Sequence, residues 1–230
     1  MPNITFTNTS GVPEEYNPKP ATDSVPEWYK QLSSYLGGEK KPTGDGNTTG
    51  TIKRCMPVFD AITNGYILYT YTDVWVSQKD GMPWYEWPSF GPIQFHPVEQ
   101  APNHPNRNGH QASYPKWINP WAIETPPGYS VLFTQPMHRE SIFTIFPGVV
   151  DTDQYNAAVN FPFVLNNIKY EGLIPAGTPM AQVIPFKRES WEMKLGTQED
   201  FDNQNKTTVR LRTRFFDSYK SQFRQLKEYK

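Results

Sequence analysis

Two short polar segments hold the side chains of this chain that are best suited to chemistry. Residues 136–141 (PMHRES) combine an imidazole, a guanidinium, a carboxylate and a hydroxyl, and residues 151–155 (DTDQY) combine two carboxylates with a phenol. A carboxylate held after a buried strand can orient a water molecule, and an arginine beside a hydroxyl can neutralise a phosphate. Any catalytic or binding chemistry is therefore predicted to lie in these two segments.

Six side chains of these segments are candidate site residues, and each has a structural alternative. The catalytic candidates are Asp151 and Asp153, and the substrate-binding candidates are His138, Arg139, Ser141 and Tyr155. In the alternative interpretation, aspartates that follow a strand cap a turn with their side-chain oxygens. The tip at residues 138–140 is then an exposed hairpin whose ion pair contributes under about 1 kcal/mol. Both interpretations stay open on the sequence alone.

The histidines raise the question of a metal site. His96, His104 and His110 are separated by 8 and 6 residues, which matches no standard zinc pattern, in a segment too rich in proline for a metal-binding helix. The single Cys55 rules out a cysteine-rich zinc site and an internal disulfide framework. We therefore predict no metal site, although a cupin-like barrel would make His96, His104 and His138 the ligands to test.

A run of short strands is expected to position the polar segments. From Thr125 to Phe186, β-branched and aromatic residues are punctuated by turns at 126–128 (PPG), 147–148 (PG) and 175–177 (PAG). This pattern predicts a compact unit of about five strands. The predicted fold class is mainly β: an antiparallel barrel, β-clip-like or sandwich domain with long loops rich in proline and aromatics, one short N-terminal helix and a short C-terminal helix.

The rest of the chain is predicted as extensions of one domain. Residues 1–50 read as an N-terminal arm, helix and linker, residues 51–216 as a single β domain, and residues 217–230 as a C-terminal helix or tail. A capping box at Ser24 begins a predicted helix of about ten residues. Its stripe of large side chains is expected to pack on the sheet and consists of Trp28, Leu32, Tyr35 and Leu36.

Further elements follow from local patterns. Strands are predicted at 51–57, at 65–76 and, from strict alternation, at 207–216, whereas residues 77–124 are predicted to form a long ordered loop held by tryptophans. Thr197, with Asp200 three residues later, is a candidate cap for a short acidic helix or turn.

Composition excludes several classes of function. The chain has 230 residues, 15% aromatics, 23 prolines and a net charge of −1, so no overall positive field recruits nucleic acid or an anionic membrane. The first residues resemble no signal peptide, and no apolar run reaches the length of a membrane span. The C-terminal 25 residues carry eight Lys or Arg against two Asp or Glu, enough to bind phosphates or an acidic surface, or simply a solvated tail.

A succession of motifs resembles the deoxyuridine triphosphatase (dUTPase) and deoxycytidine triphosphate deaminase superfamily. It comprises residues 128–133 (GYSVLF), 136–141, 148–153 (GVVDTD) and 175–184 (PAGTPMAQVI). The resemblance implies a small β fold and nucleotide chemistry, with Mg²⁺ as the cofactor only if that activity is present.

Carried onto this chain, the family pattern assigns roles to individual residues. It implies Asp151 as the base that activates water, Tyr155 as a residue that stacks on the nucleobase, and Gln182 as structural. Arg139 and Ser141 are the implied phosphate contacts. Ile67 stands where the family pattern has a metal-associated aspartate, so the resemblance implies a shared architecture more than a shared activity.

The whole chain also resembles a protein group encoded by tailed phages of marine cyanobacteria. The resemblance is carried by residues 52–57 (IKRCMP), 119–121 (NPW), 159–163 (VNFPF) and 182–186 (QVIPF). It implies a viral origin and supplies no activity. The expected location is then the host cytoplasm, with association with the virion as the alternative.

Three functional hypotheses follow. The first is a non-catalytic binding or assembly protein, either a homo-oligomer or a partner of a phage or host protein. The second is a nucleotide phosphohydrolase or deaminase-like enzyme with Asp151 as its base, which would bind a deoxynucleotide. The third is a histidine-ligated metal protein. Membrane and nucleic-acid partners are not expected.

Overall fold

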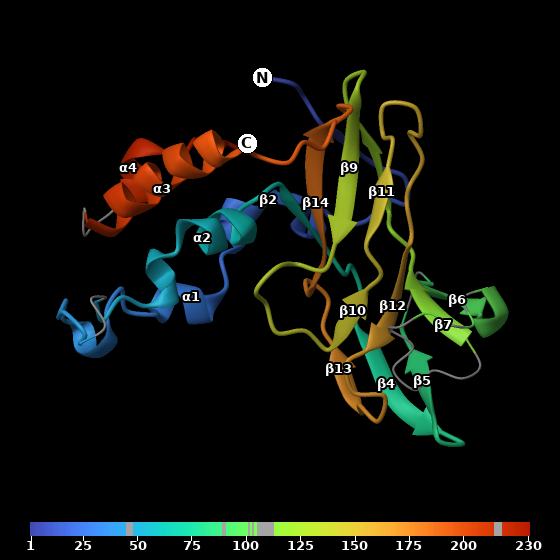
Figure 1. Cartoon of the computed structure of the whole chain (residues 1–230). Coiled ribbons are helices and arrows are strands. Elements are labelled where there is room, and N and C mark those ends of the chain that lie inside the picture. The colour runs from blue at the N-terminus through green and yellow to red at the C-terminus, as the bar shows by residue number, and fades with distance from the viewer. Residues whose placement is uncertain (45–47, 89–90, 101, 103, 105–112, 214–217) are drawn as a thin grey trace. The chain divides into compact units, whose positions relative to one another are not determined.

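The computed structural model describes residues 1–44, 48–88, 91–100, 102, 104, 113–213 and 218–230. The chain divides into two compact units (Figure 1). The first unit contains Met1–Glu27, Ala61–Arg188 and Tyr229, and the second contains Trp28–Asp60, Glu189–Glu228 and Lys230. The domain boundaries at residues 50 and 216 stay a prediction.

The first unit is built of antiparallel strands, as the sequence predicts. The strands are β1 (Thr5–Asn8), β2 (Lys19–Pro20), β3 (Tyr66–Tyr69), β4 (Val74–Lys79), β5 (Met82–Glu86), β6 (Ile93–Pro97), β7 (Ser113–Trp117), β8 (Trp121–Glu124), β9 (Tyr129–Thr134), β10 (Phe143–Ile145), β11 (Gly148–Val150), β12 (Phe161–Leu165), β13 (Gly172–Ile174) and β14 (Pro179–Lys187). They form four sheets, with the strand orders β1-β8, β10-β12-β7-β6, β11-β9-β14-β3-β2 and β13-β4-β5. No closed barrel is found among the described residues.

The five-stranded sheet is the frame for the candidate site. β14 pairs with β9 from Gln182 opposite Thr134 to Lys187 opposite Tyr129, and β11 pairs with the other edge of β9. Figure 1 shows β14, β9 and β11 side by side. The register therefore fixes what lies at each end of β9: the Tyr129 end meets the residues after β11 and β14, and the Thr134 end meets the start of the loop to β10.

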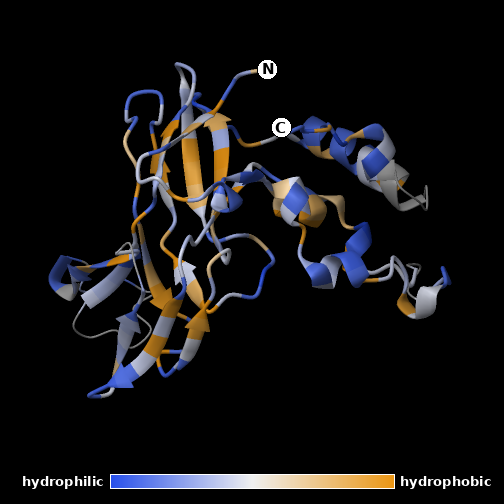
Figure 2. Cartoon of the chain, turned by 180° about the vertical axis from the view of Figure 1, so that it is seen from behind, coloured by the Kyte–Doolittle hydropathy of each residue, from blue (hydrophilic) through white to orange (hydrophobic). Residues whose placement is uncertain are grey.

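The core of the first unit is aromatic and β-branched. Trp117 stacks on Phe163 at 4.9 Å, and Phe143 packs against both rings at 5.1 and 5.3 Å. These rings are almost fully buried, and Figure 2 shows hydrophobic residues concentrated in the strands. Burying an aromatic or aliphatic side chain stabilises a fold by about 1.5–3 kcal/mol.

Several predicted strands and loops are wrong. Residues 51–57 contain a 3₁₀ turn at Ile52–Arg54 and the start of α2 (Met56–Ile62), and the Thr51 side chain caps the 3₁₀ turn by accepting a hydrogen bond from the Lys53 amide. The predicted strand 65–76 is broken into β3 and β4. Described parts of the predicted loop 77–124 form strands β5 to β8. Edge positions explain part of this, because a proline such as Pro83 in β5 needs no partner for the missing N–H.

The second unit contains most residues of the described α-helices. These are α1 (Glu27–Gln31), α2, α3 (Gln198–Thr213) and α4 (Ser218–Gln222), and Figure 2 shows α3 as mostly hydrophilic. The predicted ten-residue helix is only five residues long, and its buried side chain is Tyr29, whereas Trp28 and Leu36 are exposed. None of the helices described has the length and apolar character needed to span a membrane.

The strand predicted at 207–216 is wrong over its described part. Residues 207–213 continue helix α3, which begins at the predicted cap: the Thr197 amide donates to the Asp200 carboxylate at 2.8 Å, and the Asp200 amide donates to the Thr197 hydroxyl at 3.3 Å. A helix nucleated by such a capping box propagates one residue at a time. Residues 214–216 lie outside the described part of the chain.

Candidate functional site

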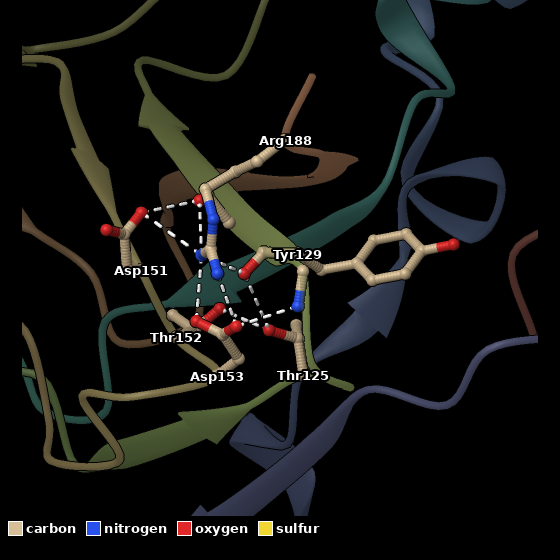
Figure 3. Close-up of polar contacts among 8 residues, drawn as sticks. Thr125, Tyr129, Asp151, Thr152, Asp153 and Arg188 are labelled. Atoms are coloured by element: carbon tan, nitrogen blue, oxygen red, sulfur yellow. Dashed lines mark hydrogen bonds and ion pairs between the residues drawn. The ribbon is translucent and has the colours of Figure 1, made fainter. Parts of the chain in front are cut away.

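The two candidate aspartates meet an arginine, and that arginine is Arg188. Asp151 and Asp153 follow β11, and Arg188 follows β14, so the register of both strands with β9 brings the three side chains to the Tyr129 end (Figure 3). Arg188 lies between the two carboxylates. Its Nη1 donates to Asp153 Oδ1 at 2.8 Å and lies 3.3 Å from Asp151 Oδ1, while its Nη2 is paired with Asp153 Oδ2.

The Asp153 carboxylate is fully engaged. Besides both guanidinium nitrogens, it accepts the backbone N–H of Gly128 at 2.8 Å, and only 2% of its side chain is exposed. Hydrogen bonds from Arg188 and then from Gly128 lower the pKa of Asp153 to about 2. A carboxylate with so low a pKa is a weak general base near neutral pH. Asp153 thus closes the turn after β11 by binding the start of β9 and the end of β14.

Asp151 is more open, but it too has internal partners. Its side chain is 60% exposed, and its Oδ1 accepts the hydroxyl of Ser130, a fully buried residue, at 2.6 Å. The buried hydroxyls of Thr125 and Thr152 form a hydrogen bond with each other at 2.7 Å. The Asp151 carbonyl accepts the Tyr155 amide at 2.8 Å. The turn is thus closed by the Asp151 carbonyl, whereas the side chains of both aspartates bind other segments, and their functional roles stay predictions.

The second candidate segment lies at the other end of β9. The Met137 amide donates to Gln182 Oε1 at 2.9 Å, and Gln182 is opposite Thr134. Tyr129 and Thr134 are five residues apart, which is about 17 Å along a strand. Within one chain, the aspartates and the start of the loop that carries His138 and Arg139 are thus not brought together. The arginine that the acids meet was missed because only the β9–β14 register reveals it.

Arg139 is an unusual residue in that loop. Its Nε and Nη2 are buried, and the described residues give them no hydrogen-bond partner. Burial lowers the pKa of Arg139, and the nearby Tyr69 opposes this. Tyr69 itself shares a hydrogen bond with the Ser24 hydroxyl, and burial raises the pKa of Tyr69. Because arginine keeps its charge in proteins, a buried guanidinium without partners is costly unless an anion reaches it.

The remaining binding candidates have mixed surroundings. His138 is exposed and adopts a left-handed backbone with φ of 55°, a conformation uncommon outside glycine that often marks functional loops. The Ser141 hydroxyl accepts the Phe143 amide at 3.3 Å and so caps the start of β10. Tyr155 is half exposed at the opposite end of β9, beside Asp151. Gln182 is structural in its contacts, as the resemblance implies.

The histidines proposed as metal ligands have other partners. His96 Nδ1 is 2.6 Å from Gln100 Oε1, and His104 stacks on Phe146 at 4.0 Å. Across the described ranges, no three His, Cys, Asp or Glu side chains are grouped closely enough to hold a metal ion. His110 falls outside the described residues.

Comparison with known proteins gives a low-level structural likeness. No protein-family model and no curated protein matches the chain. Among solved structures, a mutant dUTPase from phage phi11 of S. aureus has a TM-score of 0.33 at 15% identity, over 60% of this chain and 85% of that one. The EIAV dUTPase has a TM-score of 0.32 at 12% identity, over 73% and 98%. The dUTPase of Staphylococcus bacteriophage 80alpha has a TM-score of 0.31 at 13% identity, over 58% and 76%.

These values bear on architecture only. The dUTPase resemblance predicted from the sequence is found again at low identity and low TM-score, which carries no argument about the activity of this chain. The resemblance to proteins of cyanobacterial phages stays a prediction.

Proposed function

We propose that this protein is a non-catalytic binding and assembly protein that associates with further copies of itself. The observation that carries the proposal is the use of the candidate acids. The Asp153 side chain is almost fully buried and holds Arg188 and Gly128, and Asp151 shares the same arginine. Carboxylates that are bound to Arg188 and to neighbouring strands stabilise the first unit and are not poised to activate a water molecule.

A segment after β14 supports self-association. Residues 190–195 (SWEMKL) alternate polar and apolar side chains with the period of a half-buried strand. The segment lies outside helix and strand, and its apolar members Trp191, Met193 and Leu195 are 87%, 86% and 87% exposed. A strand-like apolar face left in water favours a conformation in which it pairs with a sheet edge and is covered.

The first unit offers edges to which such a segment can add. Among the described residues, β11 pairs with β9 on one side only, and its Val149 is 60% exposed. Strand addition supplies main-chain hydrogen bonds along the edge and pockets for alternate side chains. Since one chain carries both the donor segment and the open edge, a second copy is the simplest partner. A viral origin would place this assembly in the host cytoplasm or in the virion.

The oligomeric mass tests the proposal. We expect the purified chain to form a discrete oligomer in sedimentation velocity, and the variant with Trp191→Ser, Met193→Ser and Leu195→Ser to be a folded monomer. The matched control changes the other face of the same segment, with Ser190→Ala, Glu192→Gln and Lys194→Gln, and should keep the wild-type mass. A wild-type chain that is monomeric at all concentrations contradicts self-association.

The unpartnered Arg139 favours a second candidate function, that of a nucleotide phosphohydrolase. A phosphate oxygen would supply the partner that its buried Nε and Nη2 lack. Because Asp151 lies at the far end of β9, such a site would need the aspartate of another subunit. Mg²⁺ would then be expected to neutralise the phosphates.

Turnover distinguishes the two functions. The second candidate predicts hydrolysis or deamination of one member of a panel of deoxynucleoside triphosphates with Mg²⁺, and loss of that activity in both Arg139→Met and Asp151→Asn. The proposed binding function predicts no turnover by the wild-type oligomer. Turnover that survives Asp151→Asn would exclude Asp151 as the base in either case.

A further inference from the structure

The second unit contains a pocket that is separate from both candidate segments. It has a volume of about 320 Å³ and is lined by Tyr29, Ser34, Lys53, Arg54, Met56, Phe59, Lys220 and Arg224. We call it the basic pocket. Pockets for small ligands occupy about 300–1,000 Å³. The basic pocket is thus large enough for a compact ligand.

Its walls are fixed by contacts between α1, α2 and the C-terminal segment. Arg224 forms a two-pronged ion pair with Asp60, with Nη2 to Oδ1 at 2.6 Å and Nε to Oδ1 at 3.0 Å, and both side chains are less than one-fifth exposed. The Arg224 guanidinium also lies 5.5 Å above the Phe59 ring, which stacks on Tyr29 at 5.8 Å. The pocket is therefore built by a packed network and is not a gap between loops.

The charge of the lining is strongly positive. Four of the eight lining residues are Lys or Arg and none is acidic, and Arg224 is paired with Asp60, which is not part of the lining. The Lys53 ammonium donates to a neutral group, the Lys30 carbonyl, at 2.7 Å. Lys220 is exposed at the rim. Such a cluster of converging cations attracts a multiply charged oxyanion.

The apolar part of the lining further restricts the chemical class of ligand that the basic pocket can bind. Tyr29, Phe59 and Met56 contribute rings and a thioether beside the cations. A free inorganic anion would leave this surface wet, whereas a phosphate ester carries an organic body that can cover it. We infer that the basic pocket binds a small phosphorylated compound, with its phosphate toward Lys53 and Lys220 and its organic body over Met56. This inference is independent of the proposed self-association.

Isothermal titration of the full chain tests the inference with three defined probes. Inorganic pyrophosphate presents the charge alone, adenosine monophosphate presents a phosphate with an organic body, and adenosine presents the body alone. We expect saturable binding of both phosphorylated probes, weakened by added salt, and none of adenosine. Adenosine binding as tightly as its monophosphate, or no binding of either phosphorylated probe at about 1 mM, overturns the inference.

Charge-removing variants locate the binding. Lys53→Gln and Lys220→Gln should each weaken binding of adenosine monophosphate about tenfold, the effect of losing one charge-assisted hydrogen bond. Lys227→Gln removes an exposed lysine from the same segment outside the lining and should change affinity less than about twofold. Equal effects of all three variants would mean that the net charge of the segment attracts the probes, which overturns a defined pocket.

The single cysteine provides a second readout. Cys55 is exposed and lies in the chain between the lining residues Arg54 and Met56. Saturating adenosine monophosphate should therefore slow alkylation of Cys55 by iodoacetamide several-fold. Binding by titration with an unchanged alkylation rate would place the ligand elsewhere and refute the basic pocket as its site.

Discussion

Replacing Gln182 by methionine tests how strand β14 holds the loop that carries Arg139. Gln182 is fully buried in β14, its Oε1 accepts the Met137 amide, and its Nε2 donates to the carbonyls of Ala61 and Asn64 at 2.9 and 2.7 Å. Gln182→Met keeps the length of the side chain and removes all three hydrogen bonds. At about 1 kcal/mol per bond, the free energy of unfolding should fall by about 3 kcal/mol.

Urea unfolding followed by tryptophan fluorescence measures this loss. With a slope of about 2 kcal/mol per molar urea, a loss of this size moves the midpoint down by about 1.5 M without changing the slope. Gln154→Met is the matched control, because Gln154 is exposed in the turn after β11, and it should change stability by less than about 0.5 kcal/mol. If the two variants shift the midpoint equally, Gln182 does not have the structural role described.

Gln182→Glu separates the donors of the side chain from its acceptor. The introduced carboxylate can still accept from Met137, but it faces the carbonyls of Ala61 and Asn64 with no proton to donate. Burial favours the neutral form, so the pKa of this group is raised in the folded state, and the stability lost at neutral pH should be partly regained as the pH falls. A deficit independent of pH would contradict this account.

Four further substitutions give independent tests. Arg188 and Gly128 lower the pKa of Asp153 in the folded state to about 2. Ionised Asp153 therefore contributes stability that is present above its unfolded pKa of about 4 and is lost as the pH falls toward 2. In a pH series of unfolding midpoints, Asp153→Asn should reduce the loss of stability between about pH 4 and pH 2. Burial raises the pKa of Tyr85, whose hydroxyl has no hydrogen-bond partner among the described residues, and Tyr85→Phe should therefore stabilise the fold by about 1 kcal/mol in urea unfolding. Gly65→Ala should destabilise by at least about 2 kcal/mol by the same assay, since Gly65 has φ of 72° and a Cβ there would lie 1.9 Å from the Val183 carbonyl oxygen. Arg139→Met should raise the melting temperature of the ligand-free protein, because it removes two buried guanidinium nitrogens that have no hydrogen-bond partner among the described residues, and a lowered melting temperature would show that Arg139 is already compensated.

The sequence predicted the β character well because its signals there are local. Turns of proline and glycine mark the ends of strands β9 to β14 between Thr125 and Phe186, and the capping box at Thr197 begins α3. The alternation of side chains at 207–213 wrongly predicted a strand, because a polar helix with few apolar residues can also show a short period-two pattern. The segment 77–124 was wrongly predicted to be a loop, since prolines in edge strands cannot be told from prolines in loops by sequence.

The candidate site was only partly accessible for a different reason. Asp151 and Asp153 were identified from their own types and from the strand before them. Arg188 directly follows β14, more than 30 positions after the two acids, and only the pairing of Lys187 with Tyr129 places it against them. The electrostatic partner of Arg139 is likewise distant in sequence, because it is Tyr69 of β3. Partners set by sheet register are not encoded in any local pattern.

Hydrogen exchange at residues 190–195 is the most direct test of self-association. If this segment adds as a strand to a second copy, its backbone amides acquire partners, and their protection rises with protein concentration in the wild-type chain. The same amides should exchange rapidly at every concentration in the Trp191→Ser, Met193→Ser, Leu195→Ser variant. Rapid exchange in the wild-type chain at concentrations where it is oligomeric would contradict the account, because the copies would then be held together by another surface.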